Sequence, residues 1–343
     1  SADVQFENHI KQDLVEANLQ GGLFELPGGQ LRFAVGAAYR KNSIDFTSDS
    51  SAFEGSSFYQ TTTTFPQAST SGSEAVREVY GELFVPVLAD LPFIQELNLE
   101  LGYRLSDYDS VGSVGTYKIN GEWAPLDWLR FRGGYQKASR APNLGELFTA
   151  RTNTLSFARD GDPCSLENNT SPLLYGNYSA NPTLNTNGTA AQVQALCRQI
   201  MGADGAAQYY AAGRDDFLLG GQFFTQLLDG AGGLQEETAK TYTIGAVINA
   251  PSDSPWLRRL RLSADYYNIK LTDGISQQGI DSVLRQCFTQ EFNPNFELND
   301  ACQRIERDSV NGDMQVVTVN YDNQGAVETA GFGLLSAFAL CLL

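Results

Sequence analysis

Apolar and polar residues alternate in segment after segment of this chain, and this alternation limits the possible folds more than any other feature. Within 95–106, Leu97 and Leu99 fall on one face of an extended strand, while Glu100 and Arg104 fall on the other. Successive side chains of a strand point to opposite sides of its sheet, so each such segment has one apolar and one polar face. The pattern predicts an all-β, antiparallel fold.

About ten segments carry this pattern, the last two more weakly than the rest. The predicted strands are 13–25, 30–40, 76–89, 94–106, 113–124, 129–140, 237–250, 257–271, 314–322 and 325–338. Several exceed the ~5–6 residues usual in soluble proteins and reach the ~9–11 needed to cross a bilayer at a tilt. Their polar faces carry charged pairs, as the lumen of a membrane barrel does.

Tight turns alternate along the chain with connections that are mostly long, of which 107–112 is a short exception. Tight turns are expected at 26–30, 90–92, 125–127 and 251–256, and the other connections at 41–75, 107–112, 141–236 and 273–313. Outer-membrane barrels have short periplasmic turns and longer extracellular loops in this order. The sequence therefore predicts part of a transmembrane barrel, with 141–236 and 273–313 as long extracellular loops. Helical spacing at 190–201 and 281–290 predicts short helices within them.

Composition narrows the possible functions. With 40 acidic and 23 basic residues the net charge is -17, which argues against nucleic acid as a partner. No nucleophile–base set, metal-ligand cluster or phosphate loop is present, so we expect no enzyme activity, cofactor or metal site. The single histidine, His9, is interpreted as solvated surface. The carboxylates of Asp160, Asp162, Asp215 and Asp216 are interpreted as solvated loop acids, because they lack regularly spaced oxygen ligands for calcium.

Four of the five cysteines fall as pairs inside two polar segments. We expect the disulfides Cys164–Cys197 and Cys287–Cys302, which would staple loops in an oxidising compartment, and Cys341 is left over.

The segment S-R-A-P-N-L-G-E-L-F at 139–148 ends a predicted strand and opens the longest loop. It resembles a signature near the middle of the barrel in TonB-dependent outer-membrane receptors. The residues that carry the resemblance are Ser139, Arg140, Ala141, Pro142, Asn143, Glu146, Leu147 and Phe148. A proline forces the residue before it toward extended geometry, and an asparagine can cap the following turn. We therefore expect the motif to fix how the strand leaves the sheet.

Three further stretches resemble the same family in the same order. These are 23–40, which resembles an early barrel hairpin, 236–246, which resembles a strand entry, and 264–270, which resembles the strand that follows it. The resemblance implies energy-coupled uptake of a scarce nutrient across the bacterial outer membrane, of the siderophore-iron, cobalamin or oligosaccharide class. It also implies a barrel of about 22 strands with a plug domain inside it. Against that pattern, residues 1–343 are expected to be a barrel fragment without the plug domain and with a truncated C-terminus.

The resemblance also implies partners. These are outer-membrane lipid, a small-molecule or oligosaccharide ligand and, through the plug of the full-length protein, the TonB–ExbB–ExbD energy-transducing complex. Aromatic side chains of the longest loop are candidates to face the ligand, namely Tyr175, Tyr178, Tyr209, Tyr210, Phe223 and Phe224. The alternative for each is packing of the loop onto itself.

Two other functions stay open from the sequence. A passive porin or barrel-borne adhesin would share the alternation and need no plug. A secreted soluble β-rich binding protein would alternate as well, because soluble antiparallel sheets also have one wet face.

Overall fold

The computed structural model describes residues 5–49, 68–157, 162–166, 176–211, 223–229, 233–250 and 260–338. Twelve strands of this described part form a single sheet, and nine of them are long. The long strands are β1 (Phe6–Leu26), β2 (Gly29–Ser48), β3 (Thr70–Leu91), β4 (Ile94–Tyr108), β5 (Gly112–Leu126), β6 (Leu129–Arg140), β9 (Glu237–Asn249), β10 (Leu260–Gln277) and β12 (Met314–Phe338).

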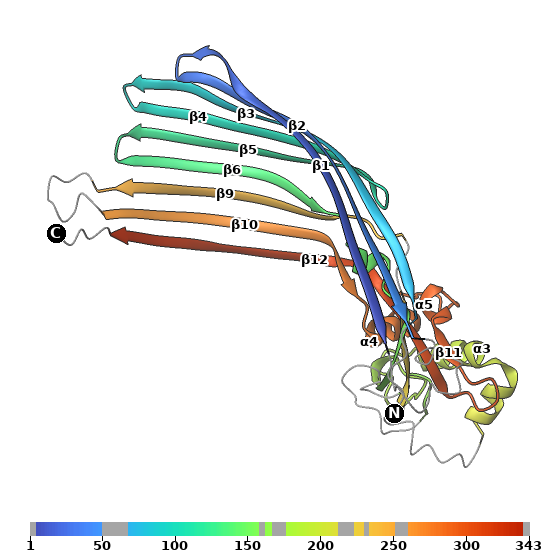
Figure 1. The fold of residues 1–343 in the computed structure, drawn as a ribbon. Helices are drawn as coiled ribbons and strands as arrows, with labels where there is room; N and C mark the ends of the chain where they lie inside the picture. The colour runs from blue at the N-terminus through green and yellow to red at the C-terminus, as the bar shows by residue number, and fades with distance from the viewer. Residues whose placement is uncertain are drawn as a thin grey trace.

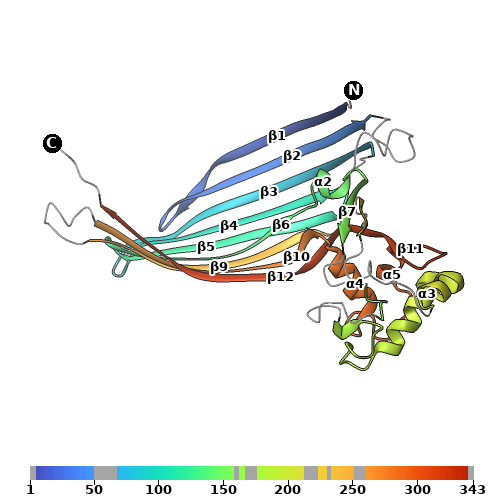
Figure 2. The ribbon, with the colours of Figure 1, turned by 90° about the horizontal axis from the view of Figure 1, so that it is seen from below.

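These nine strands lie side by side in chain order, and each pairs antiparallel with the next. Figures 1 and 2 show the sheet curving along and across its strands, as the wall of a barrel does. The all-β antiparallel prediction is confirmed. We call the end of the sheet where 141–236 and 273–313 leave it the loop end, and the opposite end the turn end.

The strand β1 begins earlier than the predicted 13, and β10 runs to Gln277, into the predicted loop 273–313. The strand boundaries correct the prediction in two further places. The segments 314–322 and 325–338 are one strand, β12, because Gly325 takes a φ of 60° without ending the ladder. Glycine tolerates that conformation at no steric cost. Second, β2 runs on to Ser48 and β3 begins at Thr70, so part of the predicted loop 41–75 is strand. In the added part of β2 the apolar residues Ile44 and Phe46 lie on the face opposite Val35, and the added residues 70–74 of β3 are polar, although the backbone ladder continues.

The two faces of the sheet differ in chemistry as predicted. One face carries exposed apolar side chains, including Val79, Leu83, Ile119, Ile244 and Leu262. Since a lipid-facing wall must be apolar, we call this the outer face. The opposite, inner face is therefore the lumen side of the wall.

The inner face carries charged pairs that bridge neighbouring strands. Lys118 on β5 lies 2.7 Å from Glu100 on β4, and Arg132 on β6 lies 2.7 Å from Asp265 on β10. The second pair spans two strand intervals, because Gly245 on the intervening β9 has no side chain to block it. A Cβ at Gly245 would collide with the Asp265 carboxylate.

Shorter elements gather at the loop end. They are α2 (Leu144–Leu147), β7 (Thr152–Phe157), η2 (Gly176–Tyr178), α3 (Ala190–Tyr209), β8 (Phe223–Asp229), α4 (Ile280–Phe288), α5 (Asp300–Gln303) and β11 (Ile305–Arg307). Both views place α3, α4, α5 and β11 at the end of the sheet away from the C-terminus (Figures 1 and 2). We call residues 162–166, 176–211 and 278–319 the cap.

The predicted helices at 190–201 and 281–290 correspond to α3 and α4, and the short strands β7, β8 and β11 were not predicted. None of the helices in the described part of the chain has the length and apolar composition to cross a bilayer.

Candidate functional site

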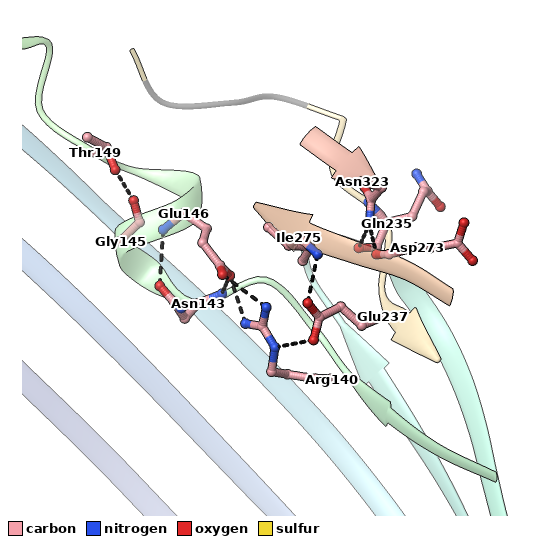
Figure 3. Close-up of polar contacts among 10 residues, drawn as sticks. All are labelled: Arg140, Asn143, Gly145, Glu146, Thr149, Gln235, Glu237, Asp273, Ile275 and Asn323. Atoms are coloured by element: carbon pink, nitrogen blue, oxygen red, sulfur yellow. Dashed lines mark hydrogen bonds and ion pairs between the residues drawn. The ribbon is translucent and has the colours of Figure 1, made fainter. Parts of the chain in front are cut away.

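The motif at 139–148 lies where β6 gives way to the longest loop, and its arginine joins three elements there. Arg140 ends β6 directly opposite Glu237, the first residue of β9. Its Nε donates to Glu237 Oε2 at 2.6 Å, while Nη1 and Nη2 donate to the two oxygens of Glu146 at 2.9 and 3.0 Å (Figure 3). One guanidinium therefore holds the point where the loop leaves the sheet and the point where it returns.

The residues after Arg140 form a one-turn helix that begins with a complete capping box. Asn143 is the N-cap of α2, and its Oδ1 accepts from the Glu146 backbone N–H at 3.0 Å. In return, Glu146 Oε2 accepts from the Asn143 N–H at 2.7 Å (Figure 3). This reciprocal pairing satisfies two backbone donors that a helix start otherwise leaves open. The strand end is thereby turned into a fixed helical bend.

This bend carries the chain across the loop end of the sheet to β3. The Phe148 ring packs directly over Gly72, where any side chain on β3 would collide with it. Thr70 Oγ1 donates to the Phe148 carbonyl at 3.1 Å, and the Ala68 N–H donates to the Arg151 carbonyl at 2.7 Å. Thr70 and Gly72 lie at odd spacings from the outward Val79 along β3, so both belong to the inner face. The segment of α2 and Phe148 that contacts them therefore lies against the inner face. The motif thus directs the loop inward over the lumen.

The returning end of the loop is tied to two further strands. Glu237 Oε1 accepts from the Ile275 N–H of β10 at 2.7 Å. The Asn323 amide of β12 donates to the carbonyls of Gln235 and Asp273 at 2.9 and 2.7 Å, and accepts from the Gln235 N–H at 2.8 Å (Figure 3). Together with Arg140 and Glu146, these residues form what we call the loop-exit cluster.

The cap is built from both long loops around one hydrophobic core. The first loop contributes residues of α3 and the second contributes α4, α5 and the start of β12. The buried members are Cys164, Ala180, Val193, Leu196, Cys197, Met201, Ala206, Tyr209, Ile280, Val283, Leu284, Cys287, Phe288, Phe296, Ala301, Cys302, Ile305, Met314, Val317 and Val319. Disulfides join Cys164 to Cys197 and Cys287 to Cys302, the two pairs expected from the sequence. Each disulfide lies within one loop, so the core joins the loops.

A buried ion pair also joins the two loops. Arg307 donates through Nη2 to Asp162 Oδ1 at 2.5 Å and through Nη1 to Oδ2 at 2.7 Å, and both side chains are fully buried. The Tyr209 hydroxyl donates to Asp162 Oδ2 at 2.8 Å, and the Cys164 N–H donates to Oδ1 at 2.9 Å. The interpretation of Asp162 as a solvated loop acid is therefore wrong.

This environment sets the protonation of the buried groups. Burial by itself would raise the pKa of Asp162, but the charge and hydrogen bonds of Arg307 outweigh it and hold that pKa below its usual range. Burial, with the Asp162 charge second, raises the pKa of Tyr209 well above that of a free tyrosine. The pair is thus ionised at neutral pH beside a neutral tyrosine.

The aromatic candidates from the sequence lie in different settings. Tyr209 is only 4% exposed in the cap core and packs edge-on against Tyr210 at 5.1 Å, which supports the packing interpretation. Tyr210 is half-buried, donates to the Cys164 carbonyl at 3.1 Å and lies under the Arg198 guanidinium. Tyr178 in η2 keeps part of its surface exposed.

Other candidates cannot be placed in this way. Phe223 and Phe224 belong to β8, with side chains outside the described residues. Tyr175 and Cys341 also lie outside them. Among the residues described, no group of three histidine, cysteine or acidic side chains could hold a metal ion.

Substituting lysine for Arg140 is expected to loosen the loop-exit cluster. A single ammonium cannot reproduce the fork that contacts Glu146 twice and Glu237 once, so the R140K variant should lose about 1–2 kcal/mol of local stability. Hydrogen exchange of the amides at 143–148 would report it as faster exchange. The matched control is R77K, because Arg77 makes one exposed ion pair of 3.4 Å to Asp109 and its change should cost close to nothing. The contact of Arg77 with the Tyr39 ring is distant, at 6.0 Å. Equal exchange at 143–148 in both variants would contradict this role for Arg140.

Comparison with known proteins places this geometry in a family context. The family model described as TonB-dependent receptor-like, β-barrel matches residues 2–337. No curated protein sequence matches the chain.

Among solved structures, the siderophore receptor PirA from Acinetobacter baumannii is 14% identical, and the match covers 96% of this chain and 35% of the receptor with a TM-score of 0.50. A mutant of the ferric enterobactin receptor PfeA from Pseudomonas aeruginosa, in complex with enterobactin, is 13% identical, with 95% and 33% covered and a TM-score of 0.53. At such identities the likeness shows the fold. The chain spans about a third of the length of these receptors.

Proposed function

The chain belongs to the TonB-dependent receptors, of whose β-barrel it forms a part, and we propose that it serves energy-coupled uptake of a scarce nutrient. Members of this family are transporters of the bacterial outer membrane rather than enzymes, so the chain is part of an outer-membrane transporter. The observation that carries the proposal is the family match over residues 2–337. The nutrient classes that we propose are siderophore-bound iron, cobalamin and oligosaccharides.

We assign the ligand-facing side to the loop end. In outer-membrane barrels the long loops lie outside the cell and the short turns face the periplasm. The segments 141–236 and 273–313 are then extracellular, and they supply the cap and the inward bend at α2. A ligand reaching the lumen from outside would pass these elements first. Energy would come from the TonB–ExbB–ExbD complex, acting on the plug of the whole receptor.

Uptake by the whole receptor that contains this chain tests the proposal. A strain that lacks its own receptors would express it and be offered a radiolabelled ferric siderophore, cobalamin or an oligosaccharide. The ferric siderophore comes first, because the two solved receptors named above are siderophore receptors. We expect accumulation of one ligand that stops when the tonB gene is deleted. Uptake that continues without TonB would instead indicate a passive pore.

A further inference from the structure

Three lysines lie side by side on the outer face of the sheet. The strand register pairs Lys137 of β6 with Lys240 of β9, and Lys240 with Lys270 of β10. They alternate along their strands with the inward residues Gln136, Thr241 and Ile269, so all three belong to the lipid-facing side. The whole chain contains only six lysines, so half of them fall in this one row, which we call the lysine row.

In the described part of the chain, the lysine row forms no ion pair. In the part of the chain that the structure describes, Lys11 pairs with Asp13 and Lys118 with Glu82 and Glu100, whereas no ion pair involves the row. The nearest carboxylate in register is Glu328 of β12, opposite Lys270, and it accepts a hydrogen bond from Asn268 at 2.9 Å. Like charges directly opposite on adjacent strands destabilise a sheet. An anion from outside the chain would relieve this repulsion.

The row sits at the membrane boundary. Tyr135 and Tyr242 lie two residues from Lys137 and Lys240 toward the turn end, and they pair with each other. The ring of Tyr242 lies 6.0 Å from that of Tyr266 in a tilted arrangement. Tyrosines on the outer face of a barrel mark the level of the lipid headgroups. Toward the turn end the same face continues with apolar residues such as Phe131 and Ile244. The lysines therefore lie on the loop side of the tyrosines, at headgroup level.

An apolar groove of about 520 Å³ adjoins the row on the same face. It is lined by Phe33, Val35, Leu83, Leu101, Tyr103 and Ile119. It also includes Tyr117, the register partner of Lys137, so the groove begins one strand away from the row. A binder that used both features would combine an anionic headgroup with hydrocarbon chains. That combination favours a lipid over a free anion.

We propose that the lysine row binds the phosphate groups of a phosphorylated outer-leaflet lipid, whose acyl chains lie along the adjoining groove. The loop end faces the cell exterior in such barrels, which places the row in the outer leaflet. Juxtamembrane lysines attract anionic headgroups. The net charge of -17 would repel such a lipid from most of the protein surface, so the row concentrates cationic charge where the lipid must meet the wall.

The test uses the full chain in detergent with lipid A, the phosphorylated glucosamine lipid, as the probe. Binding is compared for lipid A, for its dephosphorylated form and for inorganic phosphate. The wild-type chain is expected to bind lipid A and to bind the other two much more weakly. In the triple variant K137Q/K240Q/K270Q, affinity should fall on the order of fivefold per lysine, roughly a hundredfold for all three.

Three further variants keep the proposal falsifiable. K137R/K240R/K270R retains the charge and should retain binding. The control for the double variant K137Q/K240Q is K11Q/K41Q, which removes the same number of positive charges outside the lysine row. Lys11 and Lys41 both lie beside the carboxylate of Asp13. Circular dichroism confirms that each variant keeps its strands. Equal losses in the two double variants, or binding of dephosphorylated lipid A as tight as that of lipid A, would overturn the proposal. Tight binding of inorganic phosphate would show an anion site rather than a lipid site and would overturn it as well.

Discussion

Replacing Asp162 by alanine is expected to destabilise the cap by about 3–5 kcal/mol. The substitution leaves the Arg307 guanidinium fully buried without its carboxylate, and it removes the acceptor of the Tyr209 hydroxyl. An uncompensated buried charge is among the most destabilising changes that one substitution can make. Hydrogen exchange of the cap amides in the detergent-solubilised chain measures the change directly.

The double variant that replaces Asp162 by leucine and Arg307 by methionine is the control. It removes both charges, fills their volume with apolar atoms and should recover most of the stability that the D162A variant loses. As an exposed reference, D13A removes the surface partner of Lys11, for which a change below ~1 kcal/mol is expected. If D162A cost no more than D13A, the pair would not hold the cap together.

The same pair predicts how the cap responds to acid. The pKa of Asp162 is held below its ordinary value in the folded cap, so its stabilising contribution is complete above the ordinary aspartate pKa of about 3.9. The contribution is lost as the pH falls through the lower pKa of the folded state. Exchange protection of the wild-type cap should therefore change little between neutral pH and about pH 5, and fall below about pH 4. The double variant should lack the part of this acid loss that comes from Asp162.

The wall of the barrel could be predicted from the sequence because its strands and turns depend on residues that are close together in the chain. Alternation at Leu97–Arg104 needs only the pleat of a strand, and a turn such as 26–30 needs only proline and glycine. The ends of β2 and β3 were missed for the same reason. The apolar residues change face at Ile44 and Phe46, and 70–74 is polar, while the ladder between the two strands continues. The break predicted between 322 and 325 is absent, because the ladder with β10 continues past Gly325.

The cap could be predicted only in part, because its contacts are distant in sequence. The paired cysteines lie 33 and 15 residues apart, and the pairs could be predicted because each falls inside one polar segment. Asp162 and Arg307 are 145 residues apart, and neither has a neighbour in sequence that indicates burial. The sequence around Tyr209 likewise does not distinguish it from a solvent-exposed loop tyrosine. A weak signal did exist for Arg140, whose motif contains the acidic Glu146 one helical turn after Asn143, the spacing of a capping box.

The core of the cap has a consequence for how the two loops move. Segments 141–236 and 273–313 are separate in sequence, yet their buried residues form one cluster that includes a shared ion pair. If one loop opens alone, the apolar side chains of both loops become exposed to water. The free energy of opening one loop therefore includes the loss of buried apolar surface on both. We therefore expect the loops to move as one body over the lumen.

Replacing Phe288 by alanine tests this shared core and should cost about 3–5 kcal/mol. Phe288 of α4 is 1% exposed and is the largest fully buried side chain among the described residues. The matched control is F292A, four residues later and 50% exposed, for which a change within ~0.5 kcal/mol is expected. Both variants lose the same ring, so a difference between them isolates burial.

The decisive measurement is exchange protection in α3, which belongs to the other loop and lies about eighty residues earlier in the chain. If the two loops share one core, F288A should raise exchange in α3 and α4 together, since Phe288 and the buried residues of α3 belong to the same hydrophobic cluster. The Cys164–Cys197 bond lies within the first loop and would limit but not prevent this opening. Faster exchange in α4 with unchanged exchange in α3 would show two independent loops. In that case a ligand could displace one loop without moving the other.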